Sequence, residues 1–200
     1  MSPDLIRVDH HHHFIGDTHF GHVGILNMAA RPYADIRAHD RDIVDQWNAV
    51  VGEGHTVWHL GDFAGEDVPF DRAAEIFKKL NGEIRLIRGN HDGDEICSKL
   101  PWASVDIMRT IVGADGRKVV LCHYPLREWE GYHAGDIHFH GHTHDTLPSS
   151  RRSWDCGVDH QGFAPLTYDA IVERMKAKPD LDEASPGTGP WRLVLLVGPA

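Results

Sequence analysis

The sequence has few cysteines, no long apolar run and no excess of positive charge. Among its 200 residues there are three cysteines, and their odd number and unpaired spacing indicate neither a disulfide framework nor a Cys-x-x-Cys zinc site. We expect Cys97, Cys122 and Cys156 to be small buried side chains in a reducing compartment.

Segments for export or membrane insertion are also lacking. The N-terminus has no basic segment followed by an apolar run, which a signal peptide would have. The apolar stretch at residues 193–197 is too short to span a bilayer and is expected to be a buried strand. We therefore expect a soluble, cytoplasmic protein with no membrane partner, and the sequence leaves an oligomer open.

Acidic residues outnumber basic residues by 30 to 20, which gives a formal net charge of −10. This charge would repel a long polyanion, so we expect no long nucleic acid as a partner. Bound metal ions would reverse the sign of the field locally, because bound cations are often the largest charges in a site.

Histidine is the residue that the sequence has in excess, with 17 copies. A cluster of histidines near Asp and Asn residues makes metal binding the leading explanation. Four of the histidines are consecutive, at residues 10–13. This run resembles an affinity tag but leads directly into a strand-like segment, and we expect no catalytic role for it.

The apolar patterns predict an α/β fold. The order strand, helix, strand, helix, strand in the first half predicts a mainly parallel sheet with right-handed crossovers. Residues 1–200 contain no repeat or domain boundary and are expected to form one domain, a sandwich of two sheets flanked by helices. Helices are expected at residues 22–30, 36–51, 67–80 and 166–176, and extended segments at 5–17, 56–60, 83–87, 106–112, 117–122, 137–140, 154–158 and 191–197.

Five predicted strands each end in Asp, Asn or His. Singly, each of these side chains would be a turn residue more often than a ligand. Together, at the carboxyl ends of strands in an α/β sheet, they predict a polynuclear metal site. Oxygen and nitrogen donors of this kind suit Mn, Fe, Zn, Ni or Co, with manganese favoured. The motifs are Asp17-Thr18-His19, Gly61-Asp62, Gly89-Asn90-His91-Asp92, His123 and Gly141-His142-Thr143-His144.

Two metal ions about 3.5–4 Å apart clamp the attacking and leaving oxygens of a displacement at phosphorus. A carboxylate shared between the ions supports a bridging hydroxide, which is a nucleophile at neutral pH. The donor set therefore favours phosphoester hydrolysis.

The five motifs, in this order, resemble those of the calcineurin-like metallophosphoesterases. The segment Asp155-Cys156-Gly157-Val158-Asp159 resembles the one that follows the last motif in compact bacterial and phage members. The resemblance implies a four-layer αββα sandwich of two mixed sheets with helices outside. It implies that the first metal ion is held by Asp17, His19 and His144, the second by Asn90, His123 and His142, and that Asp62 bridges both.

The resemblance also implies catalytic and substrate-binding residues. His91 would stabilise the phosphoryl group or protonate the leaving oxygen, and Asp92 would orient the His91 ring. His22 and Arg31 are candidate contacts to the substrate, since a guanidinium offers paired donors to a phosphate. For Arg31 a purely structural position at the end of a surface helix is an equal alternative.

A small phosphodiester is the expected substrate, and a phosphomonoester is the alternative. Protein-phosphatase and dinucleoside-tetraphosphate relatives have Arg-Gly after Gly-Asp and Glu after Asn-His, whereas Phe63 and Asp92 stand at these places here. The acidic charge argues against polymers. Two other classes remain open: a non-catalytic scaffold of the same fold, and metal sequestration by residues 10–13.

Overall fold

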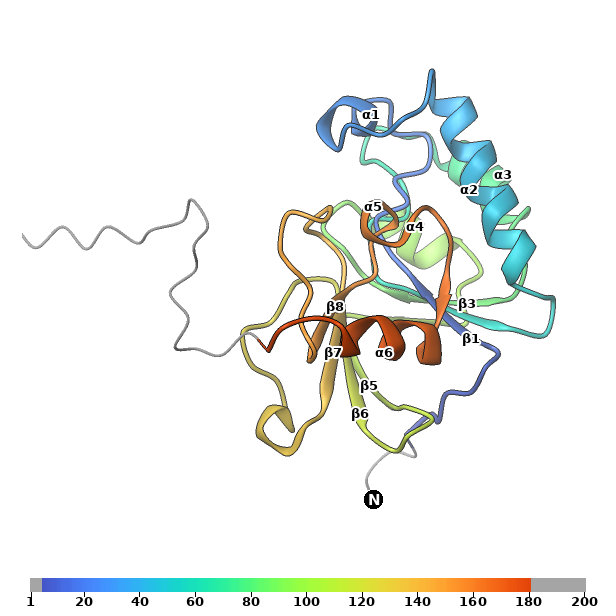
Figure 1. Cartoon of the computed structure of the whole chain (residues 1–200). Helices are drawn as coiled ribbons and strands as arrows, with labels where there is room; N and C mark the ends of the chain where they lie inside the picture. The colour runs from blue at the N-terminus through green and yellow to red at the C-terminus, as the bar shows by residue number, and fades with distance from the viewer. Residues whose placement is uncertain (1–4, 181–200) are drawn as a thin grey trace, which may run out of the picture.

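The computed structural model of the chain describes residues 5–180, in which two β-sheets pack face to face (Figure 1). The strands are β1 (His12–Ile15), β2 (Thr56–His59), β3 (Glu83–Ile87), β4 (Ser104–Asp106), β5 (Met108–Val112), β6 (Lys118–Cys122), β7 (Ile137–His140), β8 (Ser153–Asp155) and β9 (Leu166–Thr167). The helices are α1 (Ile25–Met28), α2 (Ile36–Val50), α3 (Phe70–Phe77), α4 (Asp94–Lys99), the 3-10 helix η1 (Tyr132–Ala134), α5 (Val158–Gln161) and α6 (Tyr168–Lys176).

Both sheets are mixed. The larger sheet has the strand order β4-β3-β2-β1-β9, with β9 antiparallel to β1 and the other pairs parallel. The smaller sheet has the order β5-β6-β7-β8, with an antiparallel β5–β6 hairpin and parallel pairs β6–β7 and β7–β8. The carboxyl ends of the parallel strands in each sheet therefore meet at one edge, where open α/β sheets bind ligands.

The larger sheet buries both of its faces because side chains alternate along a strand. Phe14 and Trp58 face the smaller sheet and lie in the core between the sheets. Ile15 and Val57 face the other way, into the core that also contains Trp47 of α2. These two cores fix β1 and β2 on both sides, so the loops that follow these strands start from rigid positions.

The predicted α/β class, with two mixed sheets and flanking helices, is confirmed. Several elements are shorter than predicted. The helix expected at residues 67–80 begins at Phe70, because Pro69 occupies its cap position. The extended segment at residues 5–17 pairs as a strand only over His12–Ile15, apart from two bridges, one between Arg7 and Val112 and one between Gly16 and Gly157.

Other differences arise where the chain crosses between layers. The helices α4 and α5 were not predicted, and the strand expected at residues 154–158 ends at Asp155, before Gly157 leads into α5. The hairpin strand expected from residue 106 begins at Met108, because Asp106 ends β4 in the other sheet. The strand expected at residues 191–197 lies outside the described residues.

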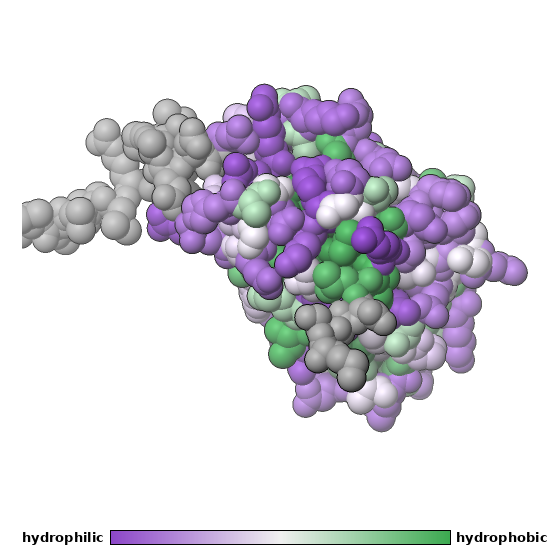
Figure 2. All heavy atoms as spheres, turned by 90° about the horizontal axis from the view of Figure 1, so that it is seen from below, coloured by the Kyte–Doolittle hydropathy of each residue, from purple (hydrophilic) through white to green (hydrophobic). Residues whose placement is uncertain are grey.

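Within residues 5–180, no helix is both long and apolar enough to cross a membrane. The molecule seen from below is mostly hydrophilic, with an apolar patch near the middle of this view (Figure 2). The run of four histidines at residues 10–13 is part of the fold, since His12 and His13 belong to β1.

Candidate metal centre

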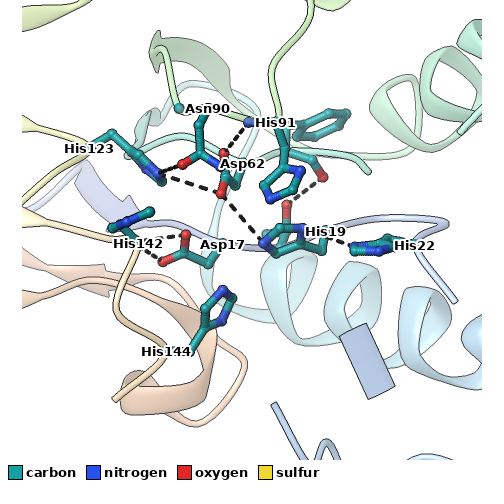
Figure 3. Close-up of polar contacts among 12 residues, drawn as sticks. Asp17, His19, His22, Asp62, Asn90, His91, His123, His142 and His144 are labelled. Carbon is teal, nitrogen blue, oxygen red and sulfur yellow. Dashed lines mark hydrogen bonds and ion pairs between the residues drawn. The ribbon is translucent and has the colours of Figure 1, made fainter. Parts of the chain in front are cut away.

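The five motifs converge at one place in the structure (Figure 3). Two groups of three residues have ligand atoms that all lie within 4.8 Å of one another. We call Asp17, His19 and His144 the first ligand group, and Asp62, His123 and His142 the second ligand group. The first joins the end of β1 to the loop after β7, and the second joins the ends of β2, β6 and β7.

Asp62, a member of the second ligand group, also lies beside the first. Its Oδ2 is 3.6 Å from His19 Nε2 in the first group and 3.5 Å from His123 Nε2 in the second. Its Oδ1 accepts a hydrogen bond from the backbone N–H of His91, at 2.8 Å. Asn90 adds a further oxygen beside the second group, with Oδ1 3.0 Å from His123 Nε2. One carboxylate is thus within reach of ligand atoms on both sides.

The backbone is strained at these residues. Positive φ angles are uncommon for residues other than glycine, and such strain gathers at functional sites. Eight non-glycine residues in the described part of the chain have positive φ, and five of them are predicted ligands. These are Asp17 (53°), His19 (48°), Asp62 (57°), His142 (71°) and His144 (46°).

The loops after β1 and β2 continue the parallel ladder of their strands. Asp17 N–H donates to Gly61 O at 2.9 Å, and His19 N–H donates to Asp62 O at 3.0 Å. Gly61 has a φ of 95°, and a Cβ at this position would lie 2.5 Å from His123 Nδ1 and 2.7 Å from the Gly89 nitrogen. Only glycine lets the three loops approach this closely.

Backbone groups orient the ligands of the second group. His123 Nδ1 lies 2.7 Å from Leu60 O, so that nitrogen carries the proton and Nε2 faces the site with a free lone pair. The backbone N–H of His142 lies 2.9–3.0 Å from both carboxylate oxygens of Asp17, which connects the two groups.

The electrostatics of the centre fit a bound cation. Burial, and then the neighbouring Asp155 and Asp62, raise the pKa of Asp17 well above its ordinary value. Burial likewise raises the pKa of Asp62 and lowers the pKa of His19. The His19 Nε2 atom is buried and has no hydrogen-bond partner. A cation would favour the ionised carboxylates and occupy this unpartnered nitrogen, so the donor set suits a transition metal.

The predicted contact between His91 and Asp92 is wrong. Both oxygens of Asp92 accept backbone hydrogen bonds at 2.8–2.9 Å, from the N–H groups of Asp62, Phe63 and Gly89. Asp92 therefore fixes the loops around the site and does not orient a ring. The carboxylate near His91 is that of Glu66, whose Oε1 lies 3.7 Å from His91 Nδ1.

The predicted substrate contact of Arg31 is also wrong, because its side chain is buried and fully used. The guanidinium donates to both carboxylate oxygens of Asp159, at 2.9 and 2.8 Å. It donates to the backbone oxygens of Asp17 and Thr18 and contacts His39 Nε2. Arg31 is thus a structural clamp beneath the first ligand group, which was the alternative that the sequence left open.

Asp159 is a residue of the site to which the sequence assigned no role. Its Oδ2 lies 2.7 Å from His144 Nδ1, so the carboxylate orients the His144 ring and leaves Nε2 for a metal ion. On the same loop, Thr143 Oγ1 donates to Asp155 Oδ2 at 2.6 Å. The signal was the family-like segment at residues 155–159, which supplies both carboxylates.

Two further side chains lie at the rim. His22 Nδ1 is 3.4 Å from His19 Nδ1, so this predicted substrate-binding residue does adjoin the first ligand group. Tyr124 was not predicted. The residue is 46% exposed, and its ring packs edge-on against His123 and His142 of the second ligand group, with centroids 5.0 and 4.8 Å apart. An exposed aromatic ring thus borders the site.

Comparisons with known proteins agree with this geometry. MJ1445, an uncharacterized protein of Methanocaldococcus jannaschii, is 30% identical over 170 residues, which cover 80% of this chain and 89% of that protein. The gene 66 protein of Mycobacterium phage L5 is 29% identical over 181 residues, which cover 74% of this chain and 86% of that protein.

A crystal structure shares the fold. It is that of AQ665 from Aquifex aeolicus, a protein of unknown function, with a TM-score of 0.64 at 22% identity, covering 82% of this chain and 98% of that one. The model of the calcineurin-like phosphoesterase superfamily domain matches residues 11–156, which include all five motifs. Members of this superfamily are in general metal-dependent phosphoesterases. The chain therefore belongs to the calcineurin-like phosphoesterase superfamily.

Proposed function

We propose that the protein is a phosphodiesterase that hydrolyses small phosphodiesters at a dinuclear metal centre. The position of Asp62, in the second ligand group and beside the first, carries this proposal, because a carboxylate within 3.5–3.6 Å of a ligand nitrogen on each side suits a bridge between two ions. When bound, two ions would align the phosphorus with an attacking water and neutralise the developing charge. Manganese is the preferred ion, and iron, zinc, nickel and cobalt suit the same donors.

Each ion has its own ligands in this proposal. The first would be held by Asp17, His19 and His144, whose ligand atoms lie together in the first ligand group. Asp62 would be shared by both ions. The second ion would be held by His123 and His142 of the second ligand group together with Asn90, whose Oδ1 adjoins His123.

His91 is the proposed proton donor. Its ring lies 5.1 Å from the His19 ring, centroid to centroid, and faces the gap between the two ligand groups (Figure 3). The Nδ1 atom is buried and has no hydrogen-bond partner. The His91 side chain is 28% exposed, so its other nitrogen, Nε2, is the proposed donor to the leaving oxygen. Glu66 Oε1, 3.7 Å from Nδ1, would stabilise a protonated ring.

Tyr124 supports a diester over a monoester. A diester carries a second organic group that does not leave, and an exposed aromatic ring beside the second ligand group offers that group a surface on which to stack. Such a contact contributes about 0.5–1.5 kcal/mol beyond area burial. The phosphomonoester remains the second candidate substrate on the same residues.

The experiment compares bis-p-nitrophenyl phosphate with p-nitrophenyl phosphate. The purified protein is stripped with chelator and given Mn²⁺, Ni²⁺ or Zn²⁺ in turn. Metal-dependent cleavage that favours the diester supports the proposal. Preference for the monoester would make a phosphomonoester the substrate class. If no metal gives activity and His91→Ala equals wild type, the scaffold function takes its place.

Tyr124 gives a sharper test of the substrate class. We expect Tyr124→Ala to raise KM for the diester by about 2–10-fold, which corresponds to the stacking contribution, and to raise KM for the monoester less. Tyr124→Phe is the matched control and should keep the wild-type KM. Equal changes for both substrates would contradict the role of Tyr124.

We further propose that the protein acts in the cytoplasm, without membrane or long nucleic acid partners. The three cysteines are free thiols, and two of them, Cys122 and Cys156, are buried, as expected in a reducing compartment. The net charge of −10 opposes binding of a polyanion. Gel filtration with light scattering would decide between a monomer and an oligomer.

A further inference from the structure

A second set of histidines lies at the amino ends of β1 and β2, away from the candidate metal centre. We call His11, His13 and His55 the β1–β2 histidine cluster. The two strands pair with His12 opposite Thr56 and His13 opposite Val57. His11 lies in the turn just before β1, and His13 lies on β1. The ring of His55, which directly precedes β2, lies beside both of their rings.

The rings of this cluster are in contact. His13 Nε2 lies 2.9 Å from His55 Nδ1, and the two rings are stacked with centroids 5.1 Å apart. The His11 ring also contacts His55, tilted by 54° with centroids 4.6 Å apart. The rings of His11 and His13 therefore both lie against His55.

The distance between the two facing nitrogen atoms matches that of two ligands on one ion. Metal–nitrogen bonds of about 2.0–2.1 Å place two imidazole nitrogens about 2.9–3.4 Å apart for angles of about 90–109° at the metal. The contact of 2.9 Å between His13 and His55 lies at the short end of this range.

The protonation state of His13 also suits a ligand. Burial, and then the adjacent His55, lower the pKa of His13 to about 4, so the ring is neutral at pH 7. Its Nδ1 atom is buried and has no hydrogen-bond partner, while its Nε2 atom contacts His55 Nδ1, a nitrogen that can either donate or accept. A neutral imidazole with an uncommitted tautomer is available for coordination.

We propose that His11, His13 and His55 form a transition-metal site, separate from the candidate metal centre, that binds Zn²⁺, Ni²⁺ or Cu²⁺. Within residues 5–180, only the two ligand groups have three His, Cys, Asp or Glu ligand atoms within 4.8 Å of one another. His11 therefore completes the site by rotation of its exposed side chain, while the nitrogen atoms of His13 and His55 are already paired.

His12 provides a matched control within the same run. It lies on the opposite face of β1, and its Nδ1 is engaged with Asp9 Oδ1 at 2.9 Å. His55, in contrast, lies outside the run at residues 10–13 and reaches the site only through the fold. A site built by the strands needs His55 and not His12, whereas a flexible histidine run needs His12 as much as its neighbours.

The test counts Zn²⁺ ions per chain after saturation and gel filtration, with elemental analysis and calorimetric titration. We expect His55→Ala and His11→Ala each to bind one ion fewer than wild type, and His12→Ala to bind as many as wild type. The same difference should appear in an Asp62→Asn background, in which the candidate metal centre is disabled. Circular dichroism confirms that each variant is folded.

Two further results bear on the site. Cu²⁺ bound to the Asp62→Asn variant should show nitrogen hyperfine coupling in its electron paramagnetic resonance spectrum, and His55→Ala should weaken it. The proposal is overturned if His55→Ala binds as many ions as wild type, or if His12→Ala loses the ion equally. The contact between His13 and His55 is then only a hydrogen bond between two imidazoles.

Discussion

The first and second ligand groups are held in different ways. In the first, His144 is oriented by the side-chain carboxylate of Asp159, which is itself paired with the buried Arg31 at 2.8 Å. In the second, His123 is oriented by a backbone carbonyl, Leu60 O, at 2.7 Å. The first ligand group is thus oriented by paired charged side chains, and the second by the main chain.

This difference has a chemical and a practical consequence. A carboxylate partner raises the basicity of a ligating imidazole more than a neutral carbonyl does. A side-chain partner is also removed by one substitution, whereas a backbone carbonyl stays in place while the fold stays intact. We therefore expect that a single substitution can weaken metal binding by the first ligand group without affecting the second.

The largest effect should come from Asp62, which belongs to both halves. We expect Asp62→Asn to lower metal binding in both ligand groups and to reduce turnover to the background rate, because the shared carboxylate is lost. Metal content by elemental analysis and hydrolysis of bis-p-nitrophenyl phosphate measure this. A variant that keeps half of the activity would show that the two groups work separately.

The next largest effect should come from His91, which belongs to neither half. We expect His91→Ala to keep the metal content of wild type and to lower kcat by about 10²–10⁴-fold, the usual contribution of a positioned acid or base. The measurement pairs turnover with elemental analysis. Loss of metal from this variant would instead place His91 among the ligands.

Asp159 tests the comparison directly. We expect Asp159→Asn to lower the affinity of the first ligand group for its metal ion by about 10–100-fold, since partners of metal ligands have effects of this size. The affinity of the second ligand group should not change. Calorimetric titration with Mn²⁺ separates the two ions. Asp145→Asn is the control, because Asp145 directly follows His144 but pairs with His160. If both affinities fell equally, the two ligand groups would not depend on separate orienting partners.

The smallest effect concerns His138, a buried residue of β7. Its Nδ1 donates to Val120 O at 2.8 Å and its Nε2 accepts from Leu126 N–H at 3.1 Å, so the neutral ring fills this buried place. Burial lowers the pKa of His138 from 6.5 to about 4. Between these two pH values the unfolded chain binds a proton that the folded chain does not.

The free energy of unfolding should therefore be unaffected by His138 above about pH 6.5 and should fall as the pH falls toward 4. Urea unfolding of the metal-free protein at pH 7, 6 and 5 measures this. We expect His138→Gln to unfold with a smaller dependence on pH than wild type. Parallel pH profiles for the two proteins would show that His138 does not cause the loss.

Much of the site could be predicted because each ligand is tied to a local pattern. A buried strand followed by a glycine-flanked turn places Asp17, Asp62 and Asn90 at carboxyl ends, and parallel pairing then brings these ends to one edge. The family resemblance added the order of the motifs. Element boundaries were less predictable, since the end of β4 at Asp106 depends on pairing with β3.

The sequence by itself determined the α/β class, a sandwich of two sheets and the set of metal-binding candidates, because periodicity and the strand-end motifs are properties of neighbouring residues. The mixed pairing of both sheets was implied by the family resemblance. Only the tertiary structure decided the partners of these residues. Arg31 contacts Asp159 across 128 positions of sequence, and Asp92 binds backbone groups 29 and 30 residues away. Adjacency in sequence suggested that Asp92 serves His91. In the fold its carboxylate instead accepts hydrogen bonds from backbone N–H groups of another loop, because buried N–H groups need an acceptor.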